Sequence, residues 1–437
     1  MGFYSRTDFN RKVISLIGAF LIHFVIGTTY TTSNLSIYIA SYLREKGSSV
    51  TLQELNILFP LQIAIATSST LIGTMLTTKY SQYLTVCIGN GLVILSVLIT
   101  SFLTEPIIVI LVFGVMYGIG CGLSYTTPLM ISWSHFPNHK GRISGIIISG
   151  FGFGTTAFNL ISTHIINPDN QKPSHKHDGT KYFSDNVSSR LPNTLRILAL
   201  CYFVISLIGI LLLGKMIKPK GQNDLQGSPL DECPSLKSGL KTKAFSTLFL
   251  LGFISNMPGL YVASAYKSYG SSEINDDDFL ALTGALGSVF NGSFRYVWAQ
   301  LMDKSSFKII ISILLMFQLC FMGSLYFISQ FKVIFLIWIC GIYACEGGLA
   351  TLFPSVIVKC FGKVTGTKIF GVYYYSVALS AISGFVIQLF IVEYFGYLTM
   401  FLVMAGLSLM SIFVVYFVFV EENPWKIENR YVLDDIN

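Results

Sequence analysis

The stretch that decides the fold is YGIGCGLSYTTP, residues 117–128, because a second stretch, YACEGGLATLFP at residues 343–354, repeats it 226 residues later. The tyrosine, the glycine–leucine pair and the proline match at identical spacing. Each stretch lies in an apolar run long enough to cross a bilayer. The repeat therefore indicates a chain made of two related halves that follow one another.

The composition around this repeat is that of a membrane protein. Of the 437 residues, 52% are hydrophobic and only 12% are charged, whereas a soluble domain carries about 25% charged residues. A soluble fold could not bury so much apolar surface, so we exclude a soluble enzyme and a disordered chain. We also exclude a nucleic-acid binder, because the positive residues are scattered between apolar runs and form no single stripe.

Twelve apolar runs are each long enough for one membrane-spanning helix. They lack the alternation of barrel strands, so the sequence predicts an all-α membrane protein with twelve transmembrane helices in two pseudo-symmetric six-helix halves. The expected division is a first half at 1–217, a cytoplasmic linker at 218–244, a second half at 245–420 and a cytoplasmic tail at 421–437. The runs are 13–42, 54–77, 84–103, 106–133, 143–165, 195–217, 245–268, 278–302, 307–329, 333–358, 368–392 and 396–420.

The orientation of the chain follows from its positive residues, which are enriched on the cytoplasmic side of membranes. With the N-terminus inside, 19 of the 29 Lys and Arg residues lie inside and nine outside, Lys267 among the nine. Both termini are then expected to be cytoplasmic, in a plasma or organelle membrane. The long polar connections 166–194 and 218–244 are expected to be flexible.

Two charged residues lie deep inside the predicted spans, Arg295 and Glu346. A charge at the bilayer centre costs roughly 2.5–3.5 kcal/mol, so such residues usually face protein or a water-filled cavity. Ser288, Asn291 and Arg295 share a small, polar helix face with Gly284. Because arginine binds a carboxylate through two parallel hydrogen bonds, this face favours an anionic substrate. The alternative is a structural Arg–Glu pair, or an arginine that reaches to the membrane surface.

The residues around Arg295 resemble a known family. NGSFRYVWAQLMDK (291–304), together with 118–128, 135–154, 346–354, 361–362 and 370–374, is similar to the oxalate/formate antiporter and monocarboxylate transporter group of the major facilitator superfamily. The resemblance implies a secondary active transporter that works by alternating access, with Arg295 holding the substrate carboxylate. By residue type and analogy, we expect Asn291, Tyr30, Tyr125 and Tyr374 to line the same site.

The resemblance also implies conformational residues and one departure in substrate. Asp303 and Lys304 match the charged loop of the superfamily, although Ala299 and Ser306 replace its glycines and Thr77 replaces the acid of the equivalent loop. The glycines of span 5 would allow sliding against the other half, or only close packing; they include Gly150, Gly152 and Gly154. Val377 stands where the oxalate carrier has a second cation, so a monocarboxylate is the better guess than oxalate.

Glu346 is the predicted proton-coupling residue. When a substrate carboxylate occupies Arg295, the charge on Glu346 loses its partner and gains a repelling neighbour, which favours proton uptake and hence symport. A purely structural carboxyl is the alternative.

A receptor or sensor on a carrier fold, and a carrier of an unrelated solute, also remain open. An enzyme is disfavoured, since catalytic motifs are absent from the spans. We expect a monomer in the lipid bilayer that binds a small organic anion and protons, with no metal, cofactor or nucleic acid.

Overall fold

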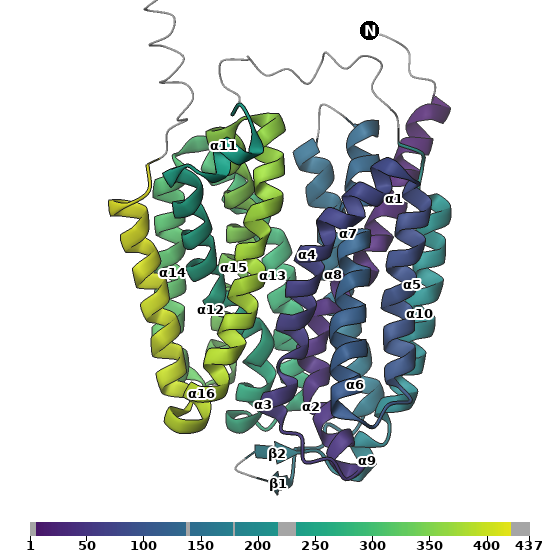
Figure 1. The fold of residues 1–437 in the computed structure, drawn as a ribbon. Coiled ribbons are helices and arrows are strands. Elements are labelled where there is room, and N and C mark those ends of the chain that lie inside the picture. The colour runs from purple at the N-terminus through teal and green to yellow at the C-terminus, as the bar shows by residue number, and fades with distance from the viewer. Residues whose placement is uncertain (1–5, 137–139, 178–179, 217–232, 421–437) are drawn as a thin grey trace, which may run out of the picture.

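The computed structural model describes residues 6–136, 140–177, 180–216 and 233–420. Long helices form two bundles that stand side by side (Figure 1), one from the first part of the chain and one from the last. Most of these helices bury one face in their bundle and present an apolar face to lipid, whereas α2 (Thr31–Glu45) and α12 (Lys243–Glu273) are buried along most of their length. The described part of the chain has the predicted all-α membrane architecture.

The first bundle runs from α1 to α10. Its elements are α1 (Arg6–Ile26), the 3₁₀ turn η1 (Gly27–Tyr30), α2 (Thr31–Glu45), α3 (Leu52–Leu55), α4 (Leu58–Lys79), α5 (Gln82–Thr100), α6 (Pro106–Val109), the π-helical η2 (Ile110–Met116), α7 (Tyr117–His135), α8 (Lys140–Ile166), β1 (His175–His177), β2 (Thr180–Tyr182), α9 (Asp185–Ser188) and α10 (Leu191–Leu212). The strands β1 and β2 form an antiparallel hairpin.

The second bundle follows a short helix. It comprises α11 (Leu236–Leu240), α12 (Lys243–Glu273), α13 (Asp277–Lys304), α14 (Phe307–Ile328), α15 (Lys332–Phe361) and α16 (Lys363–Phe417). The predicted linker 218–244 contains α11, but its residues 218–232 lie outside the described residues, as does the predicted tail 421–437. Helix α10 ends at Leu212 and α12 begins at Lys243, so the last two residues of the predicted linker belong to α12.

The helices of the described residues provide twelve membrane crossings. Within the described residues, ten helical segments are long and apolar enough to span a membrane. One of them covers Thr365–Phe417, and Gly396 interrupts it with a φ of +79°, a conformation that favours glycine, so it makes two crossings. The remaining crossing is α13, which carries several charges and packs along α15 inside the bundle.

The two bundles repeat one packing scheme. Helix α7 packs against α4 and α5, and α15 packs in the same way against α13 and α14. Pro128 lies inside α7 and Pro354 inside α15. The two repeated sequence stretches therefore occupy equivalent places in two pseudo-symmetric halves, as predicted, and we call the bundles the N-half and the C-half.

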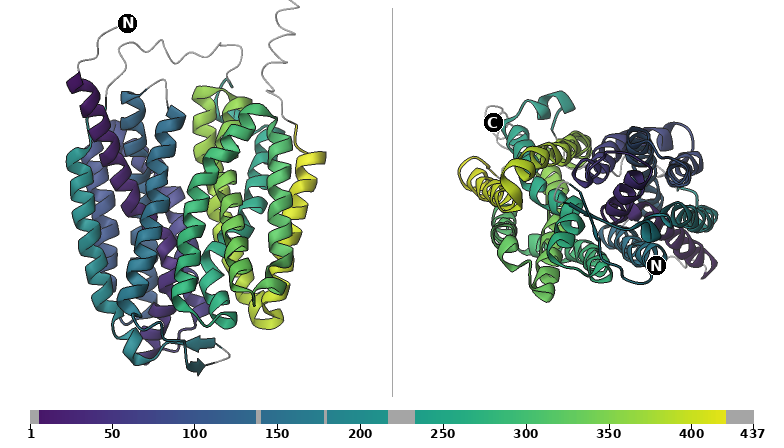
Figure 2. Two further views of the ribbon diagram at one scale, coloured as in Figure 1. Left: turned by 180° about the vertical axis from the view of Figure 1, so that it is seen from behind. Right: turned by 90° about the horizontal axis from the view of Figure 1, so that it is seen from below.

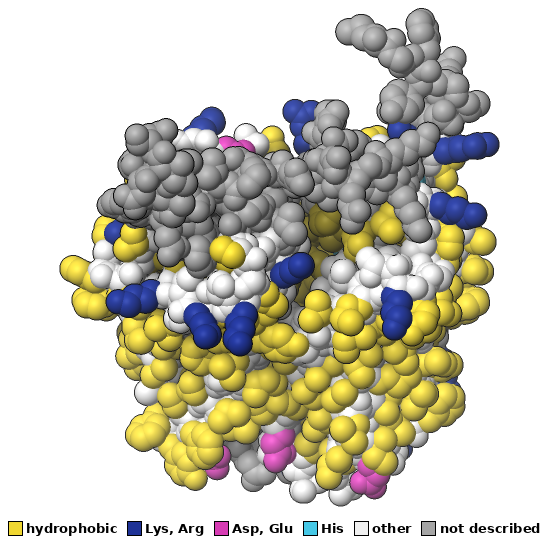
Figure 3. Space-filling model, turned by 45° about the horizontal axis from the view of Figure 1, so that its top comes forward, with side chains coloured by type: hydrophobic (Ala, Val, Ile, Leu, Met, Phe, Trp, Pro, Cys, Tyr) yellow, Lys and Arg dark blue, Asp and Glu magenta, His cyan; other side chains and the backbone are white. Residues whose placement is uncertain are grey.

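The molecule has two distinct ends. We call the end with α11 and the start of α1 the linker end, and the opposite end, with β1, β2 and α9, the hairpin end; the views in Figures 1 and 2 agree on this arrangement. Lys and Arg side chains surround the linker end, and a band of hydrophobic side chains lies below them (Figure 3). Leu211 and Phe417, near the ends of α10 and α16, are 75% and 76% exposed, as side chains that face lipid should be.

The connection 166–194 differs from the flexible loop expected from its polar composition. Its described part contains β1, β2 and α9. Tyr182 and Phe183 are buried, the Phe183 amide donates to Ser41 Oγ at 3.0 Å, and the Leu52 amide donates to the Tyr182 hydroxyl at 3.2 Å. Two buried aromatic residues thus anchor this segment against α2 and α3. The burial of these two rings outweighs the entropic cost of ordering the polar residues of the segment.

Candidate functional site

A cavity of about 140 Å³ lies between the halves. It extends from the middle of the bundles toward the linker end, because its lining on α15 and α16 comes from the middle of these helices and from the parts nearer that end, whereas α4 contributes its middle part. The residues that line it are Thr29, Tyr30, Ile63, Ala66, Thr67, Thr70, Cys121, Gly122, Tyr125, Phe151, Asn256, Leu260, Arg295, Glu346, Leu349, Ala350, Pro354, Phe370, Tyr373, Tyr374 and Val377. The lining is mainly apolar and aromatic, with one cation and one carboxylate among these residues.

Asn291 connects the cation to the carboxylate. Nε and Nη2 of Arg295 both donate to Oδ1 of Asn291, at 3.3 and 3.1 Å. Nδ2 of the same amide donates to Oε2 of Glu346 at 3.3 Å. Within the described residues, no ion pair joins Arg295 directly to Glu346. In place of the direct Arg–Glu pair considered as the alternative, the structure has an amide bridge.

Tyr30 brings the N-half to the same carboxylate. Its hydroxyl donates to Oε1 of Glu346 at 2.5 Å, and its ring packs edge-on against Phe59 and Phe151. Tyr30 belongs to η1 and Glu346 to α15, so this hydrogen bond crosses between the halves. Tyr30, Asn291 and Glu346 are all buried, whereas Arg295 is only half-buried and can meet a solute in the cavity.

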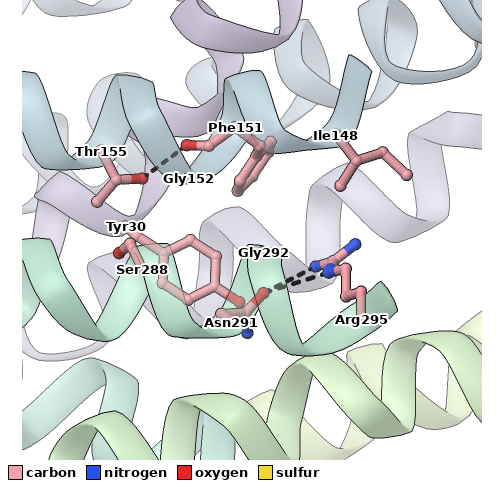
Figure 4. A pocket seen from close by; sticks show the side chains of 9 residues that line it. All are labelled: Tyr30, Ile148, Phe151, Gly152, Thr155, Ser288, Asn291, Gly292 and Arg295. Carbon is pink, nitrogen blue, oxygen red and sulfur yellow. Dashed lines mark hydrogen bonds between the residues drawn. The ribbon is translucent and has the colours of Figure 1, made fainter. Parts of the chain in front are cut away.

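A smaller pocket adjoins Arg295 on the side of α8 (Figure 4). Ser288, Asn291 and Arg295 project from α13 toward α8, where Ile148, Phe151 and Thr155 lie. The polar face predicted for this helix therefore lines the pocket over residues 288–295. Gly284 lies outside both pockets, because it packs against the Tyr266 hydroxyl.

The two other predicted tyrosines, Tyr125 on α7 and Tyr374 on α16, also line the large cavity. Val377 lines it as well, at the position where the resemblance leads one to look for a second cation. Sequence reasoning missed Asn256 and Tyr373, which line the cavity and share a hydrogen bond of 3.4 Å. Both residues lie in predicted spans. For Asn256, the sequence offered one signal, a polar amide inside an apolar run.

The three glycines of α8 fall on two different surfaces. Gly152 faces the C-half, where an added Cβ would lie 2.8 Å from the Ser288 carbonyl oxygen. Gly150 and Gly154 instead pack against Phe20 and Phe24 of α1 in their own half. Of the three glycines, only Gly152 therefore remains a candidate for a surface that slides against the other half. Asp303 and Lys304 are exposed at the linker end of α13, and their conformational role stays a prediction.

The setting of Lys267, which the predicted orientation counts on the outer side, is not evident from the sequence. Lys267 is fully buried, because α12 continues to Glu273. Its Nζ lies 2.7 Å from Oδ1 of Asp277, which is also buried. The signal was the uninterrupted run of small and aromatic residues on both sides of Lys267, which gives no sign that the helix leaves the protein there.

Comparisons with known proteins agree with this arrangement. The family model described as Major Facilitator Superfamily matches residues 16–366. Among curated proteins, the chain is 25% identical to apicoplast pyruvate carrier 1 of Toxoplasma gondii over 80% of this chain and 78% of that protein. It is 23% identical to the oxalate:formate antiporter of Oxalobacter formigenes, over 69% of this chain and 67% of that one.

Solved structures support the same fold. A D-xylose–proton symporter superimposes with a TM-score of 0.68 at 14% identity, covering 94% of this chain and 98% of that one. The nucleoside transporter NupG gives 0.67 at 14% identity, covering 94% and 100%. Likeness at this identity concerns the fold alone. From the matched family, the repeated six-helix halves and the cavity between them, we conclude that this multi-pass membrane protein is a transporter and not an enzyme, and that it belongs to the major facilitator superfamily.

Proposed function

We propose that the chain is a secondary active transporter of a small monocarboxylate, coupled to protons and working by alternating access. The observation that carries this proposal is Arg295, the one cation among the described residues that line the central cavity. It faces a space that is mainly apolar and aromatic, which suits a solute with a single charged end. Alternating access would move the N-half (1–217) against the C-half (245–420).

The hydrogen bonds of Arg295 support carboxylate binding. Nε and Nη2 form one edge of the guanidinium, and both point at the single Oδ1 of Asn291. A carboxylate would offer this edge two oxygens and a full negative charge in place of one neutral oxygen. Two parallel hydrogen bonds to an ionised acceptor add both energy and geometric specificity over two bonds that share one neutral oxygen, so a substrate carboxylate can displace the amide oxygen.

The number of charges in the cavity favours one carboxylate over two. A dicarboxylate would place its second negative charge near Glu346 or against an apolar wall that includes Val377. Leaving a buried charge without a partner is costly. Two of the relatives, a pyruvate carrier and an oxalate:formate antiporter, agree with a small carboxylate, and the pyruvate carrier agrees with a monocarboxylate.

The surroundings of Glu346 support a role in coupling proton and substrate. Asn291 bridges it to Arg295, so an anion that takes over the arginine disturbs a hydrogen bond of Glu346 and adds repulsion. Proton uptake by Glu346 then removes the repulsion. In the loaded site Glu346 is neutral, and the charges of Arg295 and the substrate carboxylate compensate each other. Tyr30 ties the same carboxylate to the N-half, which would make the contact between the halves sensitive to the proton.

We further propose that the linker end is cytoplasmic and that the protein acts as a monomer. The Lys and Arg side chains around that end agree with the enrichment of positive charge on the cytoplasmic side. In this orientation the cavity opens inward, and both termini are cytoplasmic.

Uptake into proteoliposomes tests the proposal. Labelled formate, pyruvate, lactate, oxalate and D-xylose are offered with and without a proton gradient that is acidic on the side of substrate addition. We expect the gradient to drive accumulation of one or more monocarboxylates, and to leave oxalate and D-xylose at the level of empty liposomes. Binding without uptake would favour a receptor, and uptake of the sugar alone would favour a carrier of unrelated solutes.

A further inference from the structure

A second polar cluster lies at the hairpin end, remote from the cavity. Its centre is the buried ion pair of Lys267 on α12 with Asp277 at the start of α13, 2.7 Å apart. Asp277 precedes Arg295 by 18 residues along α13, about 27 Å at 1.5 Å per residue. The pair therefore cannot touch a small substrate held by Arg295, and the transport chemistry described above does not use it.

The N-half supplies the remaining partners of this ion pair. Lys267 Nζ donates to Asn34 Oδ1 at 2.5 Å and to the Tyr38 hydroxyl at 3.2 Å. The Tyr38 hydroxyl in turn donates to Asp277 Oδ2, and Asn167 Nδ2 donates to the same oxygen at 2.8 Å. Four hydrogen bonds to charged groups thus cross between the halves at one place.

A second layer closes the interface beside the cluster. Asn170 Nδ2 donates to Asp276 Oδ1 at 3.1 Å, and Asn170 Oδ1 accepts from the backbone amides of Asp277 and Asp278. Asn170 adopts a φ of +46°, the one positive value at a non-glycine residue among those described. This residue therefore holds a less favoured backbone conformation while it caps the start of a helix in the other half.

The distribution of the charges decides what the cluster can do. Both members of the ion pair belong to the C-half, and every N-half partner is a neutral side chain. When the halves separate at this end, the lysine and the aspartate keep each other, and water can replace the neutral partners. Separation leaves no unpaired buried charge, which is the costly outcome when a buried ion pair is broken.

We propose that Lys267, Asp277, Asn34, Tyr38 and Asn167 form the gate that closes the hairpin end while the cavity is open toward the linker end. The gate holds through directional hydrogen bonds to a charge pair and opens without breaking that pair. Because the ion pair stays in the C-half throughout, the neutral residues of the N-half set the balance between the closed and open states of this end.

Hydrogen–deuterium exchange of the full-length protein in nanodiscs, without substrate, tests the gate. Tyr38→Phe removes one hydroxyl that bonds both charges and keeps the ring that stacks on Phe183. We expect at least tenfold faster exchange in the hairpin-end parts of α2 and α12, with slower exchange at the linker-end parts of α8 and α13. Opposite changes at the two ends report a shift between the two states, whereas loss of packing alone would speed exchange at both.

Tyr42→Phe is the matched control. Tyr42 lies on the same helix, is half-buried and packs against the core of the N-half, so its variant should exchange like the wild type. The double variant Lys267→Gln/Asp277→Asn, which removes both charges together, should shift exchange in the same direction as Tyr38→Phe. Exchange in Tyr38→Phe that equals the control, or that rises uniformly at both ends, overturns the gate. Since no substrate is present, the result does not depend on whether the solute is a monocarboxylate.

Discussion

At the scale of single residues, the Asn291 amide is oriented by two opposite charges. Its carbonyl oxygen accepts from Arg295 and its amino group donates to Glu346. The reverse orientation would set donor against donor and acceptor against acceptor, so this amide has one favourable orientation. Asn291 therefore links the occupancy of the arginine to the surroundings of the carboxyl without any movement of the backbone.

Replacing Glu346 by glutamine separates exchange from accumulation. The neutral amide keeps the size of the side chain and removes the group that takes up a proton. We expect Glu346→Gln to exchange labelled for unlabelled substrate across the membrane but to lose accumulation driven by an inward proton gradient. Both are measured in proteoliposomes. Accumulation that depends on the gradient as strongly as in the wild type would show that Glu346 is not the coupling group.

Replacing Val377 by lysine should change the preferred substrate. Val377 lines the cavity that holds Arg295, so a lysine there would offer a second carboxylate a partner. We expect the ratio of oxalate to pyruvate uptake to rise about tenfold or more, equivalent to about 1.4 kcal/mol. Val377→Met, which adds length without charge, is the control and should leave the ratio unchanged. An unchanged ratio in the lysine variant would place the second carboxylate elsewhere.

Individual charged residues were predictable only where they stood out from their neighbours. Arg295 and Glu346 did so, because each lies in the middle of an apolar run. Lys267 did not, since it lies within a few residues of the predicted end of its span, where a lysine usually reaches water. Its partner Asp277 belongs to a run of three aspartates that looks like a solvated loop, and only tertiary packing selects the middle one for burial.

At the scale of elements, the contact of α8 with α13 decides how closely the halves approach. Gly152 allows this approach, because an added Cβ would lie 2.8 Å from the Ser288 backbone oxygen. Gly152→Ala should therefore slow transport several-fold, since overpacking of this kind costs about 1–3 kcal/mol. Initial uptake rates at saturating substrate measure the effect.

The same helix offers a matched control for this change. An added Cβ at Gly145 meets nothing within 4 Å, so Gly145→Ala makes no new contact and raises helix propensity. We expect wild-type rates from this variant. Equal rates for Gly152→Ala and Gly145→Ala would contradict a close approach of α8 and α13 during transport.

The helices themselves were predictable from apolar run length, and the break at Gly396 matches the separation of the runs 368–392 and 396–420. The hairpin β1–β2 was not predictable, because its order depends on Tyr182 and Phe183 finding buried sites against other elements. Local polarity favours a loop there, and the long-range contacts that outweigh it cannot be read from the segment alone.

At the scale of the whole molecule, ligand binding should stabilise the fold in proportion to occupancy. A ligand present at 100 times its dissociation constant adds about 2.7 kcal/mol to the stability of the state that binds it. We expect a transported monocarboxylate to raise the unfolding temperature of the wild type and of Glu346→Gln, and to leave Arg295→Gln unchanged. Differential scanning fluorimetry of the purified protein measures this. A rise of equal size in Arg295→Gln would mean that the anion binds away from the arginine.

The central claim, that Arg295 holds the substrate carboxylate, is tested most directly by monocarboxylate uptake in proteoliposomes that contain Arg295→Gln. Arg11→Gln is the control, because Arg11 is exposed near the start of α1 and lies outside the cavity. We predict that Arg295→Gln falls to the level of empty liposomes, whereas Arg11→Gln transports like the wild type. Saturable uptake by Arg295→Gln at the wild-type rate and affinity would contradict the claim.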